Sequence, residues 1–209
     1  SATMHLAVKA GDNADSHNHN DTGSVTLYKN GHPILVDIGV ETYTQKTFSP
    51  RRYEIWTMQS GYHNLPAICG TDQKDGEEYR AGNVVAELTG TEPSISMELA
   101  AAYPDAGAIV PGLTYSRKVT LKKPSNTVVL EDYTNAQDVI LNFITYEKPV
   151  FLSDGKLSIG EASASFEGAD LLAIETLPIT DARLRTAWDH DLYRIRLKGN
   201  DAGFRLTIQ

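Results

Sequence analysis

Short runs of alternating hydrophobic and polar residues follow one another along most of this chain, and turn-forming residues separate them. Alternation with a period of two is typical of half-buried β-strands. The pattern predicts strands at Val25–Tyr28, Ile34–Ile38, Val84–Leu88, Ser94–Leu99, Tyr115–Leu121, Thr127–Asp132, Val139–Tyr146, Lys156–Ile159, Ala162–Phe166, Leu171–Thr176, Leu192–Leu197 and Phe204–Ile208. Strands this short and this regularly spaced favour an all-β fold, an antiparallel sandwich or barrel, with residues 1–209 as a single domain.

Two details refine this pattern. Asn30-Gly31 lies between the first two predicted strands, and Asn-Gly is a strong hairpin signal because both turn residues must adopt positive φ. Long helical periodicity is absent, and we expect only one short helical turn, at Asp181–Trp188.

The chemistry-bearing residues are concentrated in residues 10–70, where Asn, Asp, His, Tyr and Arg are dense. His17, His19 and Asp21 are spaced two apart, so in an extended strand they would project from one face. Both histidines could then bind one metal ion, or one could bind metal while the other faces a substrate. A polar loop with hydrogen-bonded histidines is the alternative.

Asp37 strengthens the metal interpretation because it ends the otherwise apolar run Ile34–Ile38. A carboxylate in such a place must be paired or ligated, since burying it alone is costly. His63 is the third candidate ligand, and two imidazoles with one carboxylate suit zinc. A salt bridge from Asp37 to Arg51 or Arg52 is the alternative.

Arg51, Arg52 and Tyr53 form the most basic short segment, and we expect them to bind an anionic substrate, since arginine pairs with carboxylate or sulfate in bidentate fashion. Charge balance is the alternative, because the chain has 19 basic and 27 acidic residues and a formal charge of −8. This charge argues against nucleic acid as the main partner.

Composition and chain ends limit the remaining classes. Cys69 is the only cysteine, so no internal disulfide can form. No apolar run approaches the roughly 20 residues that a membrane helix needs, and no signal peptide opens the chain. The first residue is not methionine, so we expect a fragment or a processed chain. A cupin site is excluded, because the glutamate that should follow His17-Asn18-His19 is replaced by Thr22, Gly23 and Ser24.

The same segment resembles the central motif of the heparinase II/III-like polysaccharide lyases over about residues 10–75. The residues that carry the resemblance, in collinear order, are Ala10-Gly11, Ser16-His17-Asn18-His19-Asn20-Asp21-Thr22-Gly23-Ser24, Leu27-Tyr28, Gly31, Leu35-Val36-Asp37-Ile38-Gly39, Tyr43, Arg52-Tyr53, Ser60, His63-Asn64 and Gly70. In that family this segment begins a C-terminal β-sandwich domain, which an N-terminal (α/α) toroid precedes.

The resemblance implies a role for each motif residue. His17 would line the catalytic cleft between the two domains, whereas His19, Asp37 and His63 would hold a structural zinc. The tyrosine acid/base and the group that neutralises the substrate carboxylate would come from the toroid, which this sequence does not contain. The resemblance also implies a periplasmic or secreted location and an acidic, uronic-acid-containing glycan such as a glycosaminoglycan as substrate.

We therefore expect the C-terminal β-sandwich of a polysaccharide lyase, with the toroid of the parent chain and an acidic polysaccharide as partners, and with neither nucleic acid nor membrane. The parent would cleave its glycan by β-elimination, and the fragment alone would be inactive. Two alternatives stay open: a non-catalytic, zinc-stabilised module that binds carbohydrate or has a structural role, and a free-standing metalloenzyme.

Overall fold

The computed structural model describes residues 3–200 and 202–209, and almost all of its regular structure is β. The helical elements are short: α1 (Pro104–Ile109) and the 3-10 turns η1 (Gln45–Phe48), η2 (Arg52–Glu54), η3 (Trp56–Met58), η4 (Ser60–Tyr62), η5 (Ala100–Ala102), η6 (Lys123–Ser125) and η7 (Leu184–Thr186). Within the described residues, no helix is long and apolar enough to cross a membrane.

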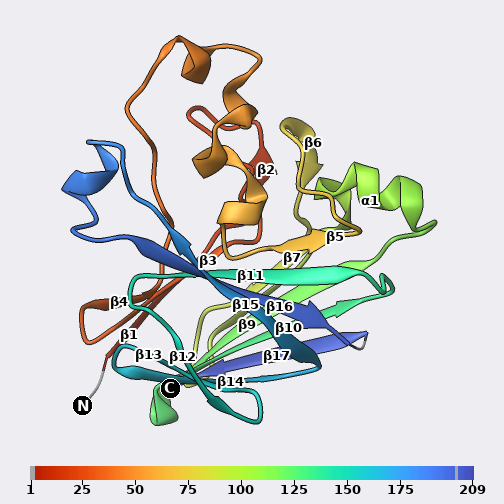
Figure 1. Ribbon diagram of the computed structural model, residues 1–209. Helices are drawn as coiled ribbons and strands as arrows, with labels where there is room; N and C mark the ends of the chain where they lie inside the picture. Colours follow the sequence, from red (N-terminus) through yellow and green to blue (C-terminus); the bar gives the residue numbers. More distant parts are fainter. Residues whose placement is uncertain (1–2, 201) are drawn as a thin grey trace.

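Seventeen strands form three antiparallel sheets (Figure 1). The strands are β1 (Met4–Val8), β2 (Asp12–Asn13), β3 (Val25–Lys29), β4 (His32–Leu35), β5 (Pro66–Ile68), β6 (Gly76–Arg80), β7 (Gly82–Glu87), β8 (Ser94–Glu98), β9 (Tyr115–Lys122), β10 (Thr127–Thr134), β11 (Val139–Thr145), β12 (Val150–Ser153), β13 (Lys156–Ile159), β14 (Ala162–Glu167), β15 (Ala169–Leu177), β16 (Leu192–Gly199) and β17 (Gly203–Ile208).

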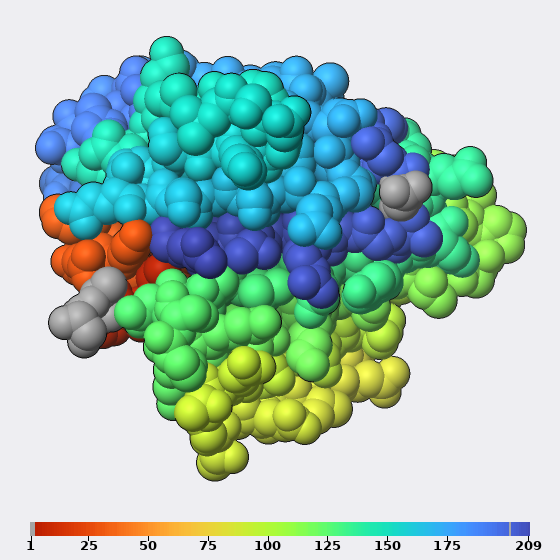
Figure 2. Space-filling view, turned by 90° about the horizontal axis from the view of Figure 1, so that it is seen from below, coloured from red at the N-terminus to blue at the C-terminus, as the bar shows by residue number. Residues whose placement is uncertain are grey.

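Two large sheets pack face to face as a β-sandwich. The first has seven strands in the order β1-β3-β4-β11-β16-β15, with β5 also paired to β11, and the second has eight in the order β12-β13-β14-β17-β10-β9-β8-β7. Figure 2 shows the second sheet from outside, from cyan strands through β17 in blue to β7 in yellow. The small sheet contains β2 and β6. The predicted antiparallel sandwich is thus confirmed, and a barrel is not formed.

Alternation along the strands places one face of each sheet in the core. In β17, for example, Phe204, Leu206 and Ile208 are buried while Arg205 faces solvent. Phe143 of the first sheet packs on Phe204 of the second, with ring centroids 6.0 Å apart. Burying each such side chain stabilises the fold by about 1.5–3 kcal/mol, so the core is the main source of stability.

The predicted strand Ile34–Ile38 is too long, because β4 ends at Leu35. The side chain of Asn64 replaces the next backbone hydrogen bond between β4 and β11, from the Ile144 amide to the Val36 carbonyl. Its Nδ2 donates to the Val36 carbonyl (3.0 Å), and its Oδ1 accepts from the Ile144 amide (2.7 Å). The chain therefore leaves the sheet just before Asp37.

Residues 36–65, which we name the excursion, leave the first sheet and return to the same strand. Leu35 pairs with Thr145 at one end of β11, and Pro66–Ile68 pair with the other end. Between these points the excursion rises above the sandwich through the turns η1 to η4, drawn in orange at the top of Figure 1. This path returns the chain to where it left, so residues at the two ends of the excursion become neighbours.

A second, smaller hydrophobic cluster lies under the segment between β15 and β16, residues 178–191, which we name the 178–191 loop. Leu184 and Trp188 from this loop pack against Val36 and Ile38 of the excursion. Trp188 Nε1 also donates to the Ile38 carbonyl at 2.8 Å. The 178–191 loop is thus anchored to the excursion beside Asp37. Its 3-10 turn η7 lies within the helical turn predicted at Asp181–Trp188.

Candidate functional site

Three predicted metal ligands lie together where the excursion leaves and rejoins the first sheet. His19, Asp37 and His63 each place one potential ligand atom so that the three atoms lie within 4.8 Å of one another. The His19 and His63 rings are 5.3 Å apart, centroid to centroid. Asp37 follows the exit of the excursion from the sheet and His63 precedes its return, whereas His19 comes from the loop before β3. The topology of the excursion therefore assembles this cluster.

His63 is fully buried and its ring orientation is fixed by the backbone. Nε2 lies 3.2 Å from the Thr57 carbonyl, which only a ring N–H can satisfy, so Nε2 carries the hydrogen. Nδ1 then faces Asp37, whose Oδ2 is 3.3 Å away, but the angle does not make a hydrogen bond. Nδ1 is thus a buried nitrogen without a well-directed partner among the described residues, as expected of a ligand whose second nitrogen is held by a carbonyl.

The electrostatics keep two of the three ligands in their binding forms. Burial and the neighbouring His63 lower the pKa of His19 to about 4, so its imidazole is neutral near pH 7. Burial would raise the pKa of Asp37, but His63 and His19 hold it below the ordinary value. Burial likewise opposes the charged form of His63, yet Asp37 raises its pKa. Asp37 therefore favours a cation at His63 Nδ1.

This donor set fits a divalent metal ion. Two imidazole nitrogens and one carboxylate are a common zinc set, with a fourth position left for another ligand. The Gly39 amide donates to Asp37 Oδ1 at 2.7 Å and fixes the carboxylate, as supporting groups do around metal ligands. Neither Arg51 nor Arg52 pairs with Asp37, so the alternative salt bridge is not formed.

The expected strand through His17, His19 and Asp21 is wrong. Residues 17–21 form turns and loop, and the φ of His17, +62°, lies far outside the range of regular extended strands. His17 is exposed and stacks on Tyr43, with centroids 6.1 Å apart and planes at 6°, while His19 turns toward His63. Asp21 pairs with Lys9 instead. The two histidines therefore have different surroundings, His17 beside Tyr43 and His19 beside His63.

The basic segment is engaged with protein groups. Arg52 donates to the Asn18 carbonyl from two nitrogens (3.1 and 2.9 Å) and to the Thr47 carbonyl (3.0 Å), and so connects the His19 loop to η1. Arg51 is exposed and pairs with Glu54 at 2.7 Å. Tyr53 lines a hollow on the side of the excursion that faces α1. Binding of substrate by these residues stays a prediction.

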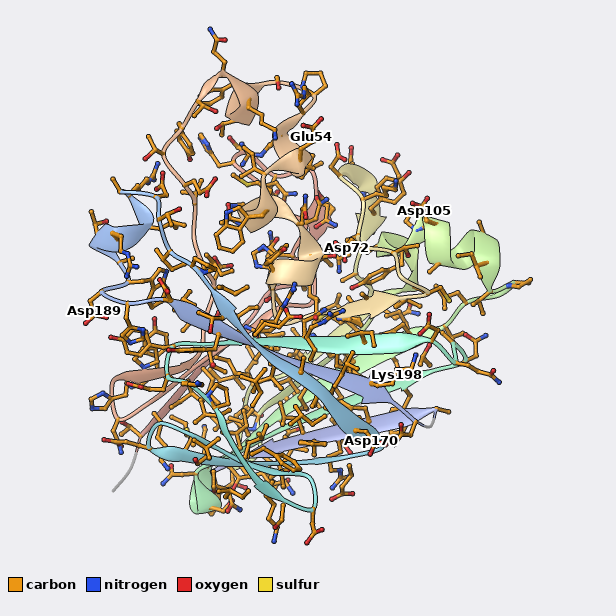
Figure 3. The ribbon with its side chains drawn as sticks, in the orientation of Figure 1. Glu54, Asp72, Asp105, Asp170, Asp189 and Lys198 are labelled. Atoms are coloured by element: carbon orange, nitrogen blue, oxygen red, sulfur yellow. The ribbon has the colours of Figure 1, made fainter. Side chains whose placement is uncertain are left out.

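That hollow has a volume of about 550 Å³ and does not border His17. Besides Tyr53, its lining includes Glu54, Asp72, Asp75 and Asp105, with Lys74. Figure 3 shows Glu54, Asp72 and Asp105 on the side of the excursion that faces α1, whereas Asp189 of the 178–191 loop lies on the opposite side. Such an acidic lining repels an anionic ligand, so this hollow does not suit an acidic glycan.

One part of the site was missed by the sequence analysis. Arg117 of β9 is buried in the core, where it forms a bidentate pair with Asp132 (2.8 and 2.7 Å). Its remaining nitrogen donates to the carbonyls of Gly23 (2.9 Å) and Asn64 (2.7 Å). Arg117 therefore ties the second sheet to the two segments that carry His19 and His63. Its position between the inward-facing residues of β9 was a signal that could have revealed it.

The sequence profile described as "Heparinase II/III-like, C-terminal" matches residues 1–140, about two thirds of the chain. The chain belongs to this family. Solved structures with the same fold include heparan sulfate lyase HepC from Pedobacter heparinus (14% identity, TM-score 0.69), a heparinase III with methylated lysines (16%, 0.67) and another heparinase III (19%, 0.64). At these identities the likeness shows the fold.

The extent of these matches is uneven. The three solved structures align with 98–99% of this heparinase II/III-like C-terminal chain, but the aligned part is only 32–33% of each solved chain. This chain therefore spans about a third of their length. A comparison with curated protein sequences found no match.

Proposed function

We propose that this chain is the C-terminal domain of a polysaccharide lyase that cleaves uronic-acid-containing glycans by β-elimination. Family membership and the third of the length shared with a heparan sulfate lyase and two heparinases III support this proposal. The observation that carries it is the arrangement of the histidines. One is exposed beside a tyrosine, and two are turned into a cluster with a carboxylate.

The chemistry requires several groups around one sugar ring. A base removes the proton from C5, next to the carboxylate, the electron pair forms a C4–C5 double bond, and the C4–O bond to the leaving sugar breaks as an acid protonates the oxygen. The carboxylate must be stabilised as charge develops. His17 has an exposed imidazole, a group that commonly serves as a general base or acid. We assign the remaining groups to an N-terminal toroid of the parent chain.

His19, Asp37 and His63 hold a structural zinc in this proposal. When bound, the ion supplies a cross-link among three segments and no step of the elimination. The residues themselves are arranged for this, since the Thr57 carbonyl and the Gly39 amide orient two of the three ligands. His17 stays outside the cluster and faces solvent next to Tyr43.

The test is an assay of the full-length parent on a panel of uronate polymers, which follows the ultraviolet absorbance of the unsaturated product. We expect turnover on at least one polymer and a loss of kcat of at least about 100-fold in His17→Ala, the range for a general acid or base. His32→Ala is the matched control, because His32 is exposed on the opposite part of the first sheet, beside Glu161. A parent that binds uronates but does not cleave them would contradict the proposal.

A further inference from the structure

An arginine that is far from His17 in sequence contacts the same tyrosine ring as His17 does. The guanidinium of Arg183, in the 178–191 loop, stacks on the Tyr43 ring at 4.7 Å from the centroid. Tyr43 in turn stacks on His17, and its hydroxyl lies 3.4 Å from His17 Nδ1. The Tyr43 ring therefore stacks with both of the other side chains, Arg183 and His17.

The guanidinium of Arg183 is free to bind a ligand. It is exposed, and no acidic side chain in residues 3–200 or 202–209 forms an ion pair with it. The nearest acid in sequence, Asp181, uses Oδ1 to accept from the amides of Thr42 (3.1 Å), Arg183 (2.9 Å) and Leu184 (3.1 Å). Among the described residues, Arg183 thus presents a guanidinium without an ion-pair partner, in a chain of net charge −8.

The backbone that carries Arg183 is held rigidly against the excursion. Asp181 joins the 178–191 loop to the Thr42 amide, and the adjacent Leu184 is buried in the second hydrophobic cluster. Tyr43 also packs against the Phe48 ring in a T-shaped arrangement, with ring centroids 5.4 Å apart. A cation held in place in this way loses little conformational freedom when it binds a ligand, which favours affinity.

We infer that Arg183 binds an anionic group, a carboxylate or a sulfate, of the glycan whose reacting sugar lies at His17. This inference rests on the proposed function and adds to it a substrate-binding residue outside both the sequence resemblance and the family match. Arginine presents a planar fork that matches either anion, and Tyr43 sets the plane of that fork by stacking. Arg51 and Arg52, in contrast, already have acceptors in the protein.

The loop offers a matched control. Arg185 is two residues further on, is also partly exposed, and pairs with Asp191 at 2.7 Å. Arg183→Ala and Arg185→Ala change the net charge equally, so a general effect of charge on an acidic ligand would appear in both variants. Arg183→Lys keeps the charge without the planar fork.

Isothermal titration of this chain provides the test, with an unsulfated glucuronic acid–N-acetylglucosamine tetrasaccharide, its sulfated counterpart, and the neutral tetramer of N-acetylglucosamine. We expect Arg183→Ala to weaken binding of an acidic ligand by about tenfold, the effect of losing one charge-assisted pair. Arg183→Lys should have a smaller effect, and Arg185→Ala should bind within about twofold of wild type. A loss only with the sulfated ligand identifies sulfate as the bound group, and a loss with both identifies the carboxylate.

Equal affinities of wild type and Arg183→Ala, or no binding of either acidic ligand by wild type, would overturn the inference. Kinetics of the parent separate this from the proposed function. Arg183→Ala should raise KM and leave kcat within about threefold, whereas His17→Ala should lower kcat. An active parent that is indifferent to Arg183→Ala would refute the role of Arg183 alone, and an inactive parent would refute the lyase assignment alone.

Discussion

Replacing Arg117 by methionine tests whether a single core arginine holds the site together. The change keeps most of the side-chain volume but removes the donors to Asp132, to the Gly23 carbonyl and to the Asn64 carbonyl. Asp132 is 2% exposed and would keep only one side-chain partner, the hydroxyl of Tyr115 at 2.7 Å. The variant therefore leaves a nearly unpaired charge in the core.

The expected cost follows from that geometry. Removing one partner of a buried ion pair costs about 3–5 kcal/mol, because the remaining charge stays desolvated. For a chain of this size, 1 kcal/mol corresponds to about 2–4 °C in Tm, so we expect a decrease of about 6–20 °C. Since the lost donors also hold the segments of His19 and His63, metal affinity should fall with stability.

Urea unfolding of Arg117→Met, followed by circular dichroism, measures this cost. Arg205→Met is the control, because Arg205 lies in the same sheet but pairs with Glu131 on the solvent side, and its loss should cost within about 0.5 kcal/mol. Adding Asp132→Leu should cost less than the sum of the single changes, since no buried charge is left. An Arg117→Met variant as stable as Arg205→Met, or strictly additive double changes, would refute the reasoning.

Four further predictions concern the metal and the division of the active site. Protein purified without a histidine tag should contain about one zinc per chain, and removing it with a chelator should lower the Tm until zinc is added back; a metal-free wild type of full stability would contradict the site. His19→Ala should lower both metal content and Tm, whereas His17→Ala should change the unfolding free energy by less than about 0.5 kcal/mol, and equal losses would show that the roles are wrongly assigned. Arg52→Gln should weaken zinc binding by about tenfold in a competition with a chelating dye, because the Asn18 carbonyl next to His19 loses its donors. Arg51→Gln should leave zinc binding unchanged. The isolated 209-residue chain should show no lyase activity on any uronate polymer, and turnover that is lost on His17→Ala would disprove the division of the site between domains.

The parts of the fold that the sequence could predict are those that depend on local pattern. Period-two alternation indicated most strands of the two large sheets, because each of these strands buries one face, but β1, β5 and β12 were not predicted. The end of β4 at Leu35 could not be predicted in this way, since it depends on the side chain of Asn64 from the far end of the excursion. Strands β2 and β5 have too few residues to show a period, and the sequence of β6, Gly-Glu-Glu-Tyr-Arg, does not alternate between apolar and polar residues.

The same distinction between local pattern and contacts of distant segments applies to the candidate site. His19, Asp37 and His63 could be proposed together from residue type and order, and the structure brings them within reach of one ion. The strand through His17 was wrong because a positive φ at a histidine has no signature in residue type. Arg183 could not be found at all, since its contact with Tyr43 joins segments 140 residues apart.

The path of the excursion has a consequence for how such proteins diversify. Its two ends meet on one strand, β11, so the segment between Asp37 and His63 can change in length without altering the order of the strands in the sandwich, whereas Asn64 sets the end of β4 and belongs to the support. A metal ion bound by Asp37 and His63 would join the two ends of the excursion, so that the excursion forms a closed loop on the sandwich. Variation in sequence can therefore be concentrated in this segment and in the 178–191 loop that packs against it, while the sandwich beneath keeps its strand order.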